Sequence, residues 1–175
     1  FADFAIVLCV TDPTSTPVGI SALLIDLDAP GVSVTHEYLP MSGQHIDADI
    51  RLTNVRVPQS NLLGGLGRGF QLSMSRINVN RLLHCPTMLG LANRAYQMSL
   101  DYARQRRQFG GPIARFQAIQ HMLADMATDW AAARGLMLAT ARAIDAGAEP
   151  RAESSMAKLF CSEAAFRIAD RAVQI

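Results

Sequence analysis

The first third of the chain has the short apolar and alternating stretches that are typical of β-strands. Residues 5–10 and 18–27 are apolar runs, and residues 32–35 and 50–53 alternate apolar and polar side chains. Because successive side chains of a strand point to opposite faces, the spacing predicts a small antiparallel sheet unit over residues 1 to about 57. We expect Val55 and Val57 to extend the last strand past a bulge.

The remaining two thirds repeat apolar residues every three or four positions, the period of an amphipathic α-helix. The first row predicts a helix from about residue 70 to 105 and consists of Phe70, Met74, Ile77, Arg81, Cys85, Met88, Ala92, Ala95, Ser99 and Ala103. The second consists of Phe116, Ile119, Leu123, Met126, Trp130, Ala133, Met137 and Ile144. The third consists of Met156, Phe160, Ala164 and Val173. We assign the second row to the core of an up-down helical bundle.

These patterns predict a multi-domain α and β protein. A partial antiparallel β-barrel or sandwich segment covers residues 1–57, a Gly-rich connection covers 58–69, and a truncated helical bundle covers 70–175. The glycines of the connection suit either a phosphate cradle or a flexible link between domains, and their spacing is not that of a dinucleotide fingerprint. We expect both chain ends to be cuts in a longer polypeptide, because the chain begins with Phe1 and the last helical pattern has no stop signal.

Composition narrows the classes of function. Half of the residues are apolar and the net charge is +1, which argues against broad electrostatic binding to nucleic acid or to an anionic membrane. The early apolar run is too short to cross a membrane. The three cysteines form no Cys-x-x-Cys, which makes a disulfide framework or zinc site improbable and favours a reducing, intracellular setting.

Acid-base and nucleophilic chemistry find little support in the chain. The four histidines lack helical pairing for a metal, and no Gly-x-Ser-x-Gly is present. Cys85, in an apolar row, favours packing over a role as nucleophile. Asp47 and Asp49 suit a solvated strand face better than an acid pair. The polar face of the second helix predicts a solvated surface or subunit contact and carries His121, Asp125, Asp129 and Arg142.

The most informative stretch joins the first two predicted helices and reads RQRRQFGGPIARFQAIQHMLADM from Arg104 to Met126. Three arginines precede a Phe-Gly-Gly-Pro break, and Gln117 lies in the first turn of the next helix. Guanidinium groups pair with phosphate oxygens bidentately, and a glutamine amide both donates and accepts. The junction therefore suits a planar, phosphate-bearing ligand, although an exposed basic helix end is the alternative for Arg106 and Arg107.

Arg81 is the second candidate, since it interrupts the apolar row of the first predicted helix. Burying an unpaired guanidinium is very costly, so an anion or a carbonyl should meet it. Asn78 lies one turn earlier and can hydrogen-bond the same ligand. The alternatives are that Arg81 extends to the surface or forms an internal ion pair.

The junction resembles the signature of the acyl-CoA dehydrogenase family of flavoproteins. The matching positions are Arg106, Arg107, Phe109, Gly110, Gln117, Ala118 and Ile119. Weaker similarities extend over the whole chain, at residues 1–13, 28–31, 54–65 and 170–175. The resemblance implies a fragment that covers the end of the middle β domain and most of the C-terminal helical domain.

The resemblance also implies ligand contacts. It places Arg106 at the pyrophosphate of FAD, and it makes cofactor contacts of Gln108, Phe109, Gln117 and Gln174. Members of the family usually offer such residues to the FAD of a neighbouring subunit. For the acyl-CoA substrate it implies contacts from Arg81 and from Asn78, which replaces an aspartate of the family.

The implied reaction is α,β-dehydrogenation of an acyl-CoA thioester, in which a carboxylate removes a proton and flavin N5 receives a hydride. In a minority of the family the base lies at the position of Asn80, whose amide cannot serve, and in most members it lies beyond Ile175. We therefore expect the catalytic glutamate to be absent from this chain, and we name no catalytic residue and no metal.

The resemblance further implies fatty acid metabolism and an electron-transfer flavoprotein or similar acceptor. It implies a homodimer or homotetramer in the cytoplasm, or in the mitochondrial matrix of a eukaryote. Two alternatives stay open. One is an acyl-CoA oxidase-like relative of the same fold, and the other is a non-catalytic assembly module.

Overall fold

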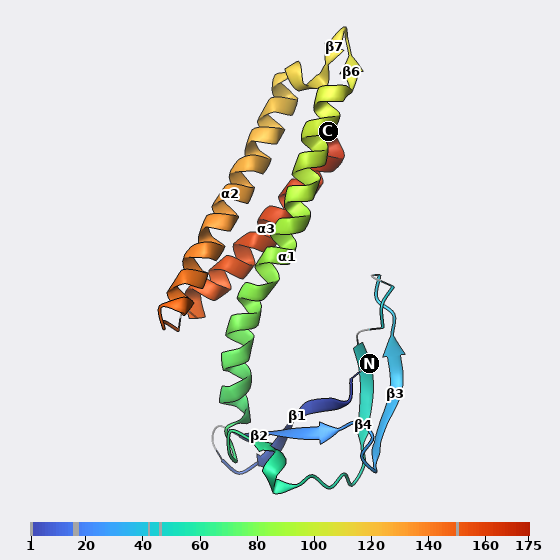
Figure 1. The fold of residues 1–175 in the computed structure, drawn as a ribbon, viewed down its shortest axis with the longest axis vertical. Coiled ribbons are helices and arrows are strands. Elements are labelled where there is room, and N and C mark those ends of the chain that lie inside the picture. Colours follow the sequence, from blue (N-terminus) through green and yellow to red (C-terminus); the bar gives the residue numbers. More distant parts are fainter. Residues whose placement is uncertain (1, 16–17, 42, 46, 150) are drawn as a thin grey trace. The chain divides into compact units, whose positions relative to one another are not determined.

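The computed structural model describes residues 2–15, 18–41, 43–45, 47–149 and 151–175. The chain divides into two compact units, Phe1–Ser75 and Arg76–Ile175, which we call the β unit and the helical unit. The first long helix, α1 (Gly69–Gln105), contributes residues to both (Figure 1). The expected domain boundaries, with a β segment that ends at residue 57 and a connection that ends at residue 69, stay a prediction.

A three-stranded antiparallel sheet forms one part of the β unit. Strand β1 (Phe4–Asp12) pairs with β2 (Gly19–Asp26), and the short β5 (Leu62–Leu63) pairs with the other edge of β2. Phe4 lies opposite Asp26, and the register shifts between Val10 and Asp12. The predicted strand character of the first third of the chain is therefore confirmed.

A separate two-stranded sheet pairs β3 (Val32–Tyr38) with β4 (Asp47–Leu52) in antiparallel order. The expectation that Val55 and Val57 extend this strand is wrong. Strand β4 ends at Leu52 because Asn54 adopts a left-handed conformation with φ of 52°, which an extended strand cannot contain. The register irregularity lies instead in β3, between Val34 and His36.

The glycine-rich connection packs closely against β2 within the β unit. A Cβ atom on Gly69 would lie 2.4 Å from the carbonyl carbon of Ser21, so only glycine fits where α1 begins. The Ser21 hydroxyl accepts a hydrogen bond of 2.9 Å from the Gly67 N–H. Backbone packing thus accounts for one of the glycines, and the start of the helix depends on it.

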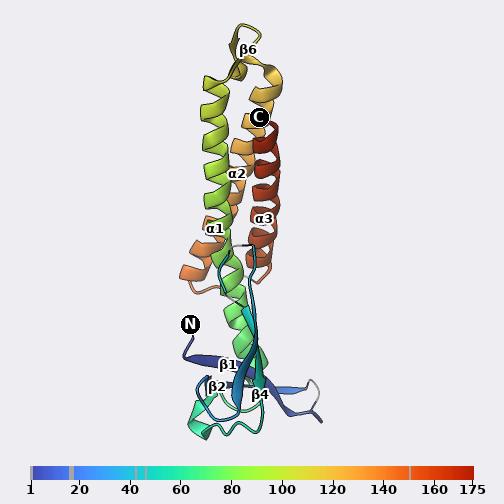
Figure 2. The same cartoon turned by 90° about the vertical axis from the view of Figure 1, so that its right-hand side faces the viewer.

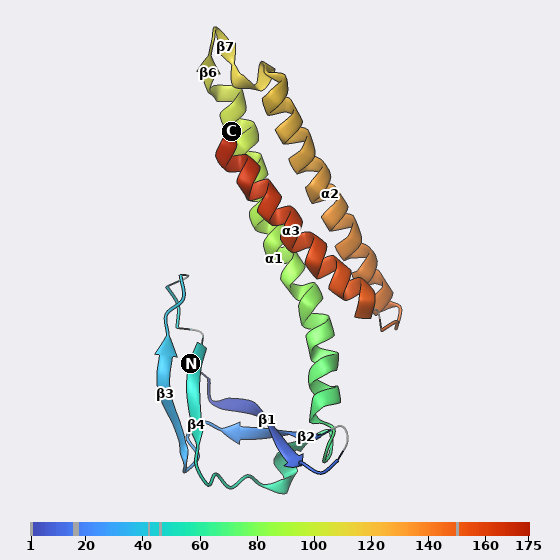
Figure 3. The ribbon, with the colours of Figure 1, turned by 180° about the vertical axis from the view of Figure 1, so that it is seen from behind.

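Three long helices form the helical unit. After α1, α2 (Gln117–Asp145) runs back and α3 (Arg151–Gln174) runs forward again, as Figures 1, 2 and 3 show. The helices predicted from about 70 to 105 and from 116 to 144 are confirmed. The fold class is also confirmed, with the qualification that the sheets of the described residues are small and open and none closes into a barrel.

The core of the helical unit consists of two clusters of buried residues. The members of the first are Cys85, Leu89, Ala133, Ala157, Cys161 and Ala164. The members of the second are Ala92, Met126 and Ile168. Trp130 packs against both clusters, and its Nε1 donates a hydrogen bond of 3.2 Å to the carbonyl of Leu89. The indole therefore connects α2 to α1 at the centre of the bundle.

The buried face of α3 differs from the predicted row. Met156 and Val173 are 50% and 82% exposed, so the row that contains them does not mark the buried face of the helix. The residues that are buried on this helix are Ser154, Ala157, Cys161, Ala164 and Ile168. Small side chains let α3 approach its neighbours closely, whereas several of its larger apolar side chains face outward.

Candidate functional site

A two-residue hairpin occupies the connection between α1 and α2. Strands β6 (Arg107–Gln108) and β7 (Gly111–Pro112) pair around Phe109 and Gly110, whose φ angles are 50° and 84°. Positive φ at both central residues defines the tight turn that suits the twist of paired strands. Phenylalanine has a steric cost in this conformation, and such strain is often found at functional positions.

Backbone and arginine hydrogen bonds fix the hairpin to the helices. The Arg106 N–H donates to the Tyr102 carbonyl at 2.8 Å, which continues α1, and the Ile113 N–H donates to the Arg106 carbonyl at 2.9 Å. The Arg115 guanidinium donates to the Phe109 carbonyl. A Cβ atom on Gly111 would lie 2.7 Å from Arg115 Nη1, so glycine leaves room for that guanidinium. The turn is therefore held in one shape.

The predicted cofactor residues lie on the surface of this junction. Arg106, Gln108 and Gln117 are exposed, and Phe109 is 87% exposed. The ring of Phe109 meets the ring of Phe116 edge to face, with 6.1 Å between centroids. Gln117 is the first residue of α2, and no side chain caps this helix end. The first N–H groups of α2 thus lack a side-chain acceptor and carry partial positive charge.

Positive charge at this junction is not neutralised by nearby carboxylates. The arginines gathered there are Arg104, Arg106, Arg107 and Arg115. Among the described residues, the ion pairs involve Glu37, Asp125 and Asp129, and none of them reaches these four side chains. A cluster of cations with an exposed aromatic ring and an exposed amide has the composition of a nucleotide or phosphate site. Arg106, Gln108 and Phe109 thus all lie on the short segment that joins α1 to α2, and Gln117 lies where that segment enters α2.

Gln174 lies on a different element but at the same end of the bundle. It lines a pocket of about 660 Å³ together with Ser99 and Tyr102 of α1 and the last residues of α3. Tyr102 lies one helical turn before Arg106 and accepts its backbone hydrogen bond. Figure 1 shows the end of α3 beside the end of α1. The structure thus places Gln174 beside the helix that carries Arg106.

Arg81 is held by neutral oxygens and by no carboxylate. Its Nη1 donates to Asn78 Oδ1 at 3.2 Å and to Ser155 Oγ of α3 at 3.3 Å. The ion pairs of the described residues do not include Arg81, so the internal ion pair that the sequence left open is wrong for this part of the chain. Sequence reasoning missed Ser155, which gives no signal because it lies 74 residues further along.

The two groups of predicted site residues are far apart on one chain. Arg81 and Arg106 lie on one continuous helix and its immediate end. At a rise of about 1.5 Å per residue, the 25 positions between them span roughly 37 Å. Within one chain, the substrate group and the cofactor group therefore mark two separate places.

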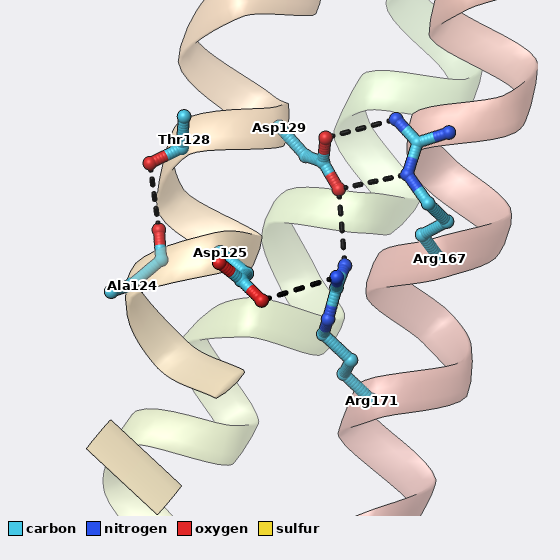
Figure 4. Close-up of polar contacts among 6 residues, drawn as sticks. All are labelled: Ala124, Asp125, Thr128, Asp129, Arg167 and Arg171. Carbon is cyan, nitrogen blue, oxygen red and sulfur yellow. Dashed lines mark hydrogen bonds and ion pairs between the residues drawn. The ribbon is translucent and has the colours of Figure 1, made fainter. Parts of the chain in front are cut away.

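An ion cluster joins α2 to α3 (Figure 4). Arg167 donates to both oxygens of Asp129, from Nε at 3.0 Å and from Nη2 at 2.9 Å. Arg171 donates to Asp129 from Nη1 at 3.1 Å, and its Nη2 lies 3.2 Å from Asp125 Oδ2. The assignment of this face to solvent or to a subunit contact is therefore wrong for Asp129, which is 19% exposed, whereas Asp125 is 60% exposed and agrees with a solvated surface. Both bind arginines of the same chain.

The titration behaviour of these groups indicates structural roles. Hydrogen bonds from Arg167, followed by its charge and by Arg171, lower the pKa of Asp129 against the opposing effect of burial. Burial raises the pKa of Cys161 to about 12 and also raises the pKa of Cys85. An aspartate that is ionised near neutral pH and two neutral buried thiols are poor acid-base catalysts and poor nucleophiles. The packing interpretation of Cys85 agrees with this.

Neither a metal cluster nor a membrane span is found in the described part of the chain. No group of three or more histidine, cysteine or acidic side chains there could hold a metal ion. None of its helices combines the length and the apolar character needed to cross a bilayer.

Comparisons with known proteins add a family relationship. Residues 67–175 match the family model described as acyl-CoA dehydrogenase, C-terminal domain. The chain is 40% identical over 176 residues to an acyl-CoA dehydrogenase of Bacillus subtilis (strain 168), covering 99% of this chain and 46% of the relative. It is 38% identical over 174 residues to the caffeyl-CoA reductase-Etf complex subunit CarC of Acetobacterium woodii, again covering 99% and 46%.

A solved structure shows the same fold. The structure of PigA with FAD and proline superposes with a TM-score of 0.94 at 26% identity, covering 99% of this chain and 46% of that chain. The chain spans about half the length of the curated relatives it matches.

Proposed function

Because the chain belongs to the acyl-CoA dehydrogenase family, we propose that it is part of an FAD-dependent oxidoreductase that introduces a double bond between the α and β carbons of an acyl-CoA thioester. The observation that carries this proposal is the junction of α1 and α2. Uncompensated arginines, a strained exposed phenylalanine and an exposed glutamine are gathered there at the positions of the family signature. FAD, when bound, supplies the hydride acceptor of the reaction.

The residues of the junction fit the chemistry of FAD. The guanidinium of Arg106 pairs with the pyrophosphate, since no carboxylate of the described residues competes for it. Phe109 packs beside the cofactor, and the amides of Gln108 and Gln117 offer hydrogen bonds to it. Gln174 contributes from the end of α3. The similarity to PigA, whose structure is described as containing FAD, supports this assignment.

Arg81 and Asn78 bind the acyl-CoA ester in this proposal. A distance of roughly 37 Å along α1 separates them from Arg106. One site that uses both groups is thus most simply built from two copies of the chain, in a homodimer or homotetramer. Binding of FAD by the assembled form then adds its free energy to assembly.

The proton base of the reaction lies outside the residues assigned here. Asn80 carries an amide, which accepts a proton poorly, and Asp101 is the only acid between residues 70 and 112. This chain therefore supplies cofactor and substrate binding, and a catalytic glutamate belongs to a segment that it does not contain. In this proposal residues 1–57 end the middle β domain, 58–69 connect, and 70–175 form the C-terminal helical domain.

Electrons then pass to an electron-transfer flavoprotein or a similar acceptor. The similarity to CarC, named as a subunit of a caffeyl-CoA reductase-Etf complex, supports this partner. A fatty acid substrate and a location in the cytoplasm or mitochondrial matrix complete the proposal.

Absorbance of the flavin tests the proposal on a purified holoenzyme that contains this chain. Anaerobic addition of butanoyl-CoA should bleach the flavin, and the bleached form should persist for long in air when no other acceptor is present. Rapid reoxidation by oxygen would favour the oxidase-like alternative. A colourless protein that does not take up FAD would contradict the proposal and favour the assembly module.

A further inference from the structure

The guanidinium of Arg81 is fixed through one of its nitrogens. Nη1 donates to Asn78 Oδ1, one turn earlier on α1, and to Ser155 Oγ on α3. The Ser155 hydroxyl donates its own proton to the carbonyl of Arg151 at 2.9 Å, so its lone pairs are available to Arg81. Both hydrogens of Nη1 are therefore used, and the plane of the guanidinium is set by two helices.

The other edge of the same group, formed by Nε and Nη2, keeps its hydrogen-bonding capacity. Within the described residues, the hydrogen bonds and ion pairs of the Arg81 side chain all involve Nη1, and both acceptors are neutral. The side chain is half-buried, so its charge is only partly screened by water. An edge of this kind matches two oxygens of a phosphate or carboxylate.

Arg167 shows the same edge when it is occupied. Its Nε and Nη2 bind the two oxygens of Asp129, and the carboxylate neutralises the cation. Arg81 has neutral amide and hydroxyl oxygens on the opposite side and keeps its full charge for an incoming group. The two arginines thus differ in which edge is used and in whether the charge is compensated.

We infer that Ser155, together with Asn78, is a positioning residue that orients Arg81 so that its Nε–Nη2 edge binds a phosphate group of the acyl-CoA ester. The inference rests on the proposed function, which makes Arg81 a substrate-binding residue. It also changes the role of Asn78, whose side-chain oxygen acts on the ligand through Arg81. Ser155 brings α3 into the substrate site, and no sequence pattern assigns it there.

The test uses the holoenzyme and S-butyl-CoA, a thioether that binds without reacting, with the dissociation constant measured by calorimetry. Replacing Ser155 with alanine removes one acceptor of a charged donor and should raise this constant by about threefold. Ser155→Thr keeps the hydroxyl and should restore the original value. Ser162→Ala is the matched control, because this α3 hydroxyl also donates to its own helix, to Leu159 at 2.8 Å, and contacts no arginine in the described hydrogen bonds.

A double-mutant cycle separates positioning from a merely structural role. Arg81→Ala alone should weaken binding by roughly tenfold to a hundredfold, as for a charge-assisted hydrogen bond. In that background Ser155→Ala should have no further effect, since its partner is gone. With S-butylpantetheine, which lacks the phosphates, Ser155→Ala should be silent.

Different failures point to different errors. The positioning role is wrong if Ser155→Ala raises the dissociation constant of S-butyl-CoA equally with and without Arg81. It is also wrong if Ser155→Ala has no effect in either background while Arg81→Ala weakens binding. In both cases the proposed function stands. An equal effect on the pantetheine thioether overturns the assignment of a phosphate. If Arg81→Ala leaves binding unchanged, the substrate role of Arg81 in the proposed function fails, and this inference fails with it.

Discussion

Arginines at two places in the helical unit meet opposite surroundings. Between α2 and α3, Arg167 and Arg171 bind carboxylates of Asp125 and Asp129. At the end of α1, Arg106 and its neighbours lie at a strained turn with no carboxylate partner in the described residues. In the first group, carboxylates of the same chain neutralise the arginines, and these ion pairs hold two helices together. The second leaves its charge available, which is what a site for an anion requires.

The largest expected effect concerns the uncompensated group. Arg106→Ala should weaken FAD binding to the holoenzyme by roughly tenfold to a hundredfold, because a guanidinium-phosphate pair is lost. Equilibrium dialysis with FAD measures this. Arg142→Ala, at an exposed position near the end of α2, should leave FAD binding unchanged. Equal FAD affinity of the Arg106 variant and the unmodified enzyme would contradict the proposal that the uncompensated arginines bind FAD.

Changes in the group whose charges are neutralised, Asp129 with Arg167 and Arg171, should alter the stability of the fold rather than ligand binding. Asp129→Ala removes the acceptor of two arginines and should lower the free energy of unfolding by about 1–2 kcal/mol, an estimate reduced for the partial exposure of both arginines. Urea unfolding followed by circular dichroism measures it. Asp125 is 60% exposed, so Asp125→Ala should cost less than about 0.5 kcal/mol. Similar costs for both variants would contradict the central place of Asp129.

The pH dependence sharpens the same point. Because Arg167 and Arg171 lower the pKa of folded Asp129, its contribution to stability is present above the unfolded pKa and is lost as the pH falls through the folded one. The difference in unfolding free energy between the unmodified protein and Asp129→Ala should stay constant from about pH 7 to 5 and shrink below about pH 4. Urea unfolding at each pH measures this difference. A difference that already shrinks near neutral pH would assign the effect to another group.

The smallest expected effect on FAD binding tests whether the shape of the hairpin holds the arginines in position for FAD. Gly110 has φ of 84°, and a Cβ atom added there would meet open space, so Gly110→Ala strains the turn by about 1 kcal/mol through the backbone alone. FAD affinity should fall by about fivefold in equilibrium dialysis. Gly135, in open space on α2, is the control, because Gly135→Ala should leave FAD binding unchanged and stabilise the helix by up to about 1 kcal/mol. Unchanged affinity of the Gly110 variant would show that the turn tolerates reshaping.

Much of the helical unit follows from periodicity in the sequence. Helices α1 and α2 begin and end within about two residues of their predicted limits, since long apolar rows define them strongly. The third helix is found but its face is wrong, because Ala157, Cys161 and Ala164 pack closely while Met156 and Val173 stay exposed. Apolar size alone does not reveal which face of a helix fits a neighbour.

The sequence predicts those parts of the candidate site whose residues lie close together along the chain, and it does not predict contacts between distant positions. The arginines, Phe109 and Gln117 stand near one another in the sequence, and the hairpin gathers them. The contact of Arg81 with Ser155 joins positions 74 residues apart, and only the packing of α3 on α1 creates it. The ion cluster had a usable signal. Acids four residues apart on α2 face arginines four residues apart on α3, and that matched spacing was available in the sequence.

The chain contains a single tryptophan, and its place between both core clusters gives the protein a built-in optical probe. Emission from an indole that is hydrogen-bonded to α1 and packed on α2 and α3 shifts to longer wavelength when water reaches it. Loosening of the three helices therefore shifts the emission of Trp130 and can be followed without an added dye.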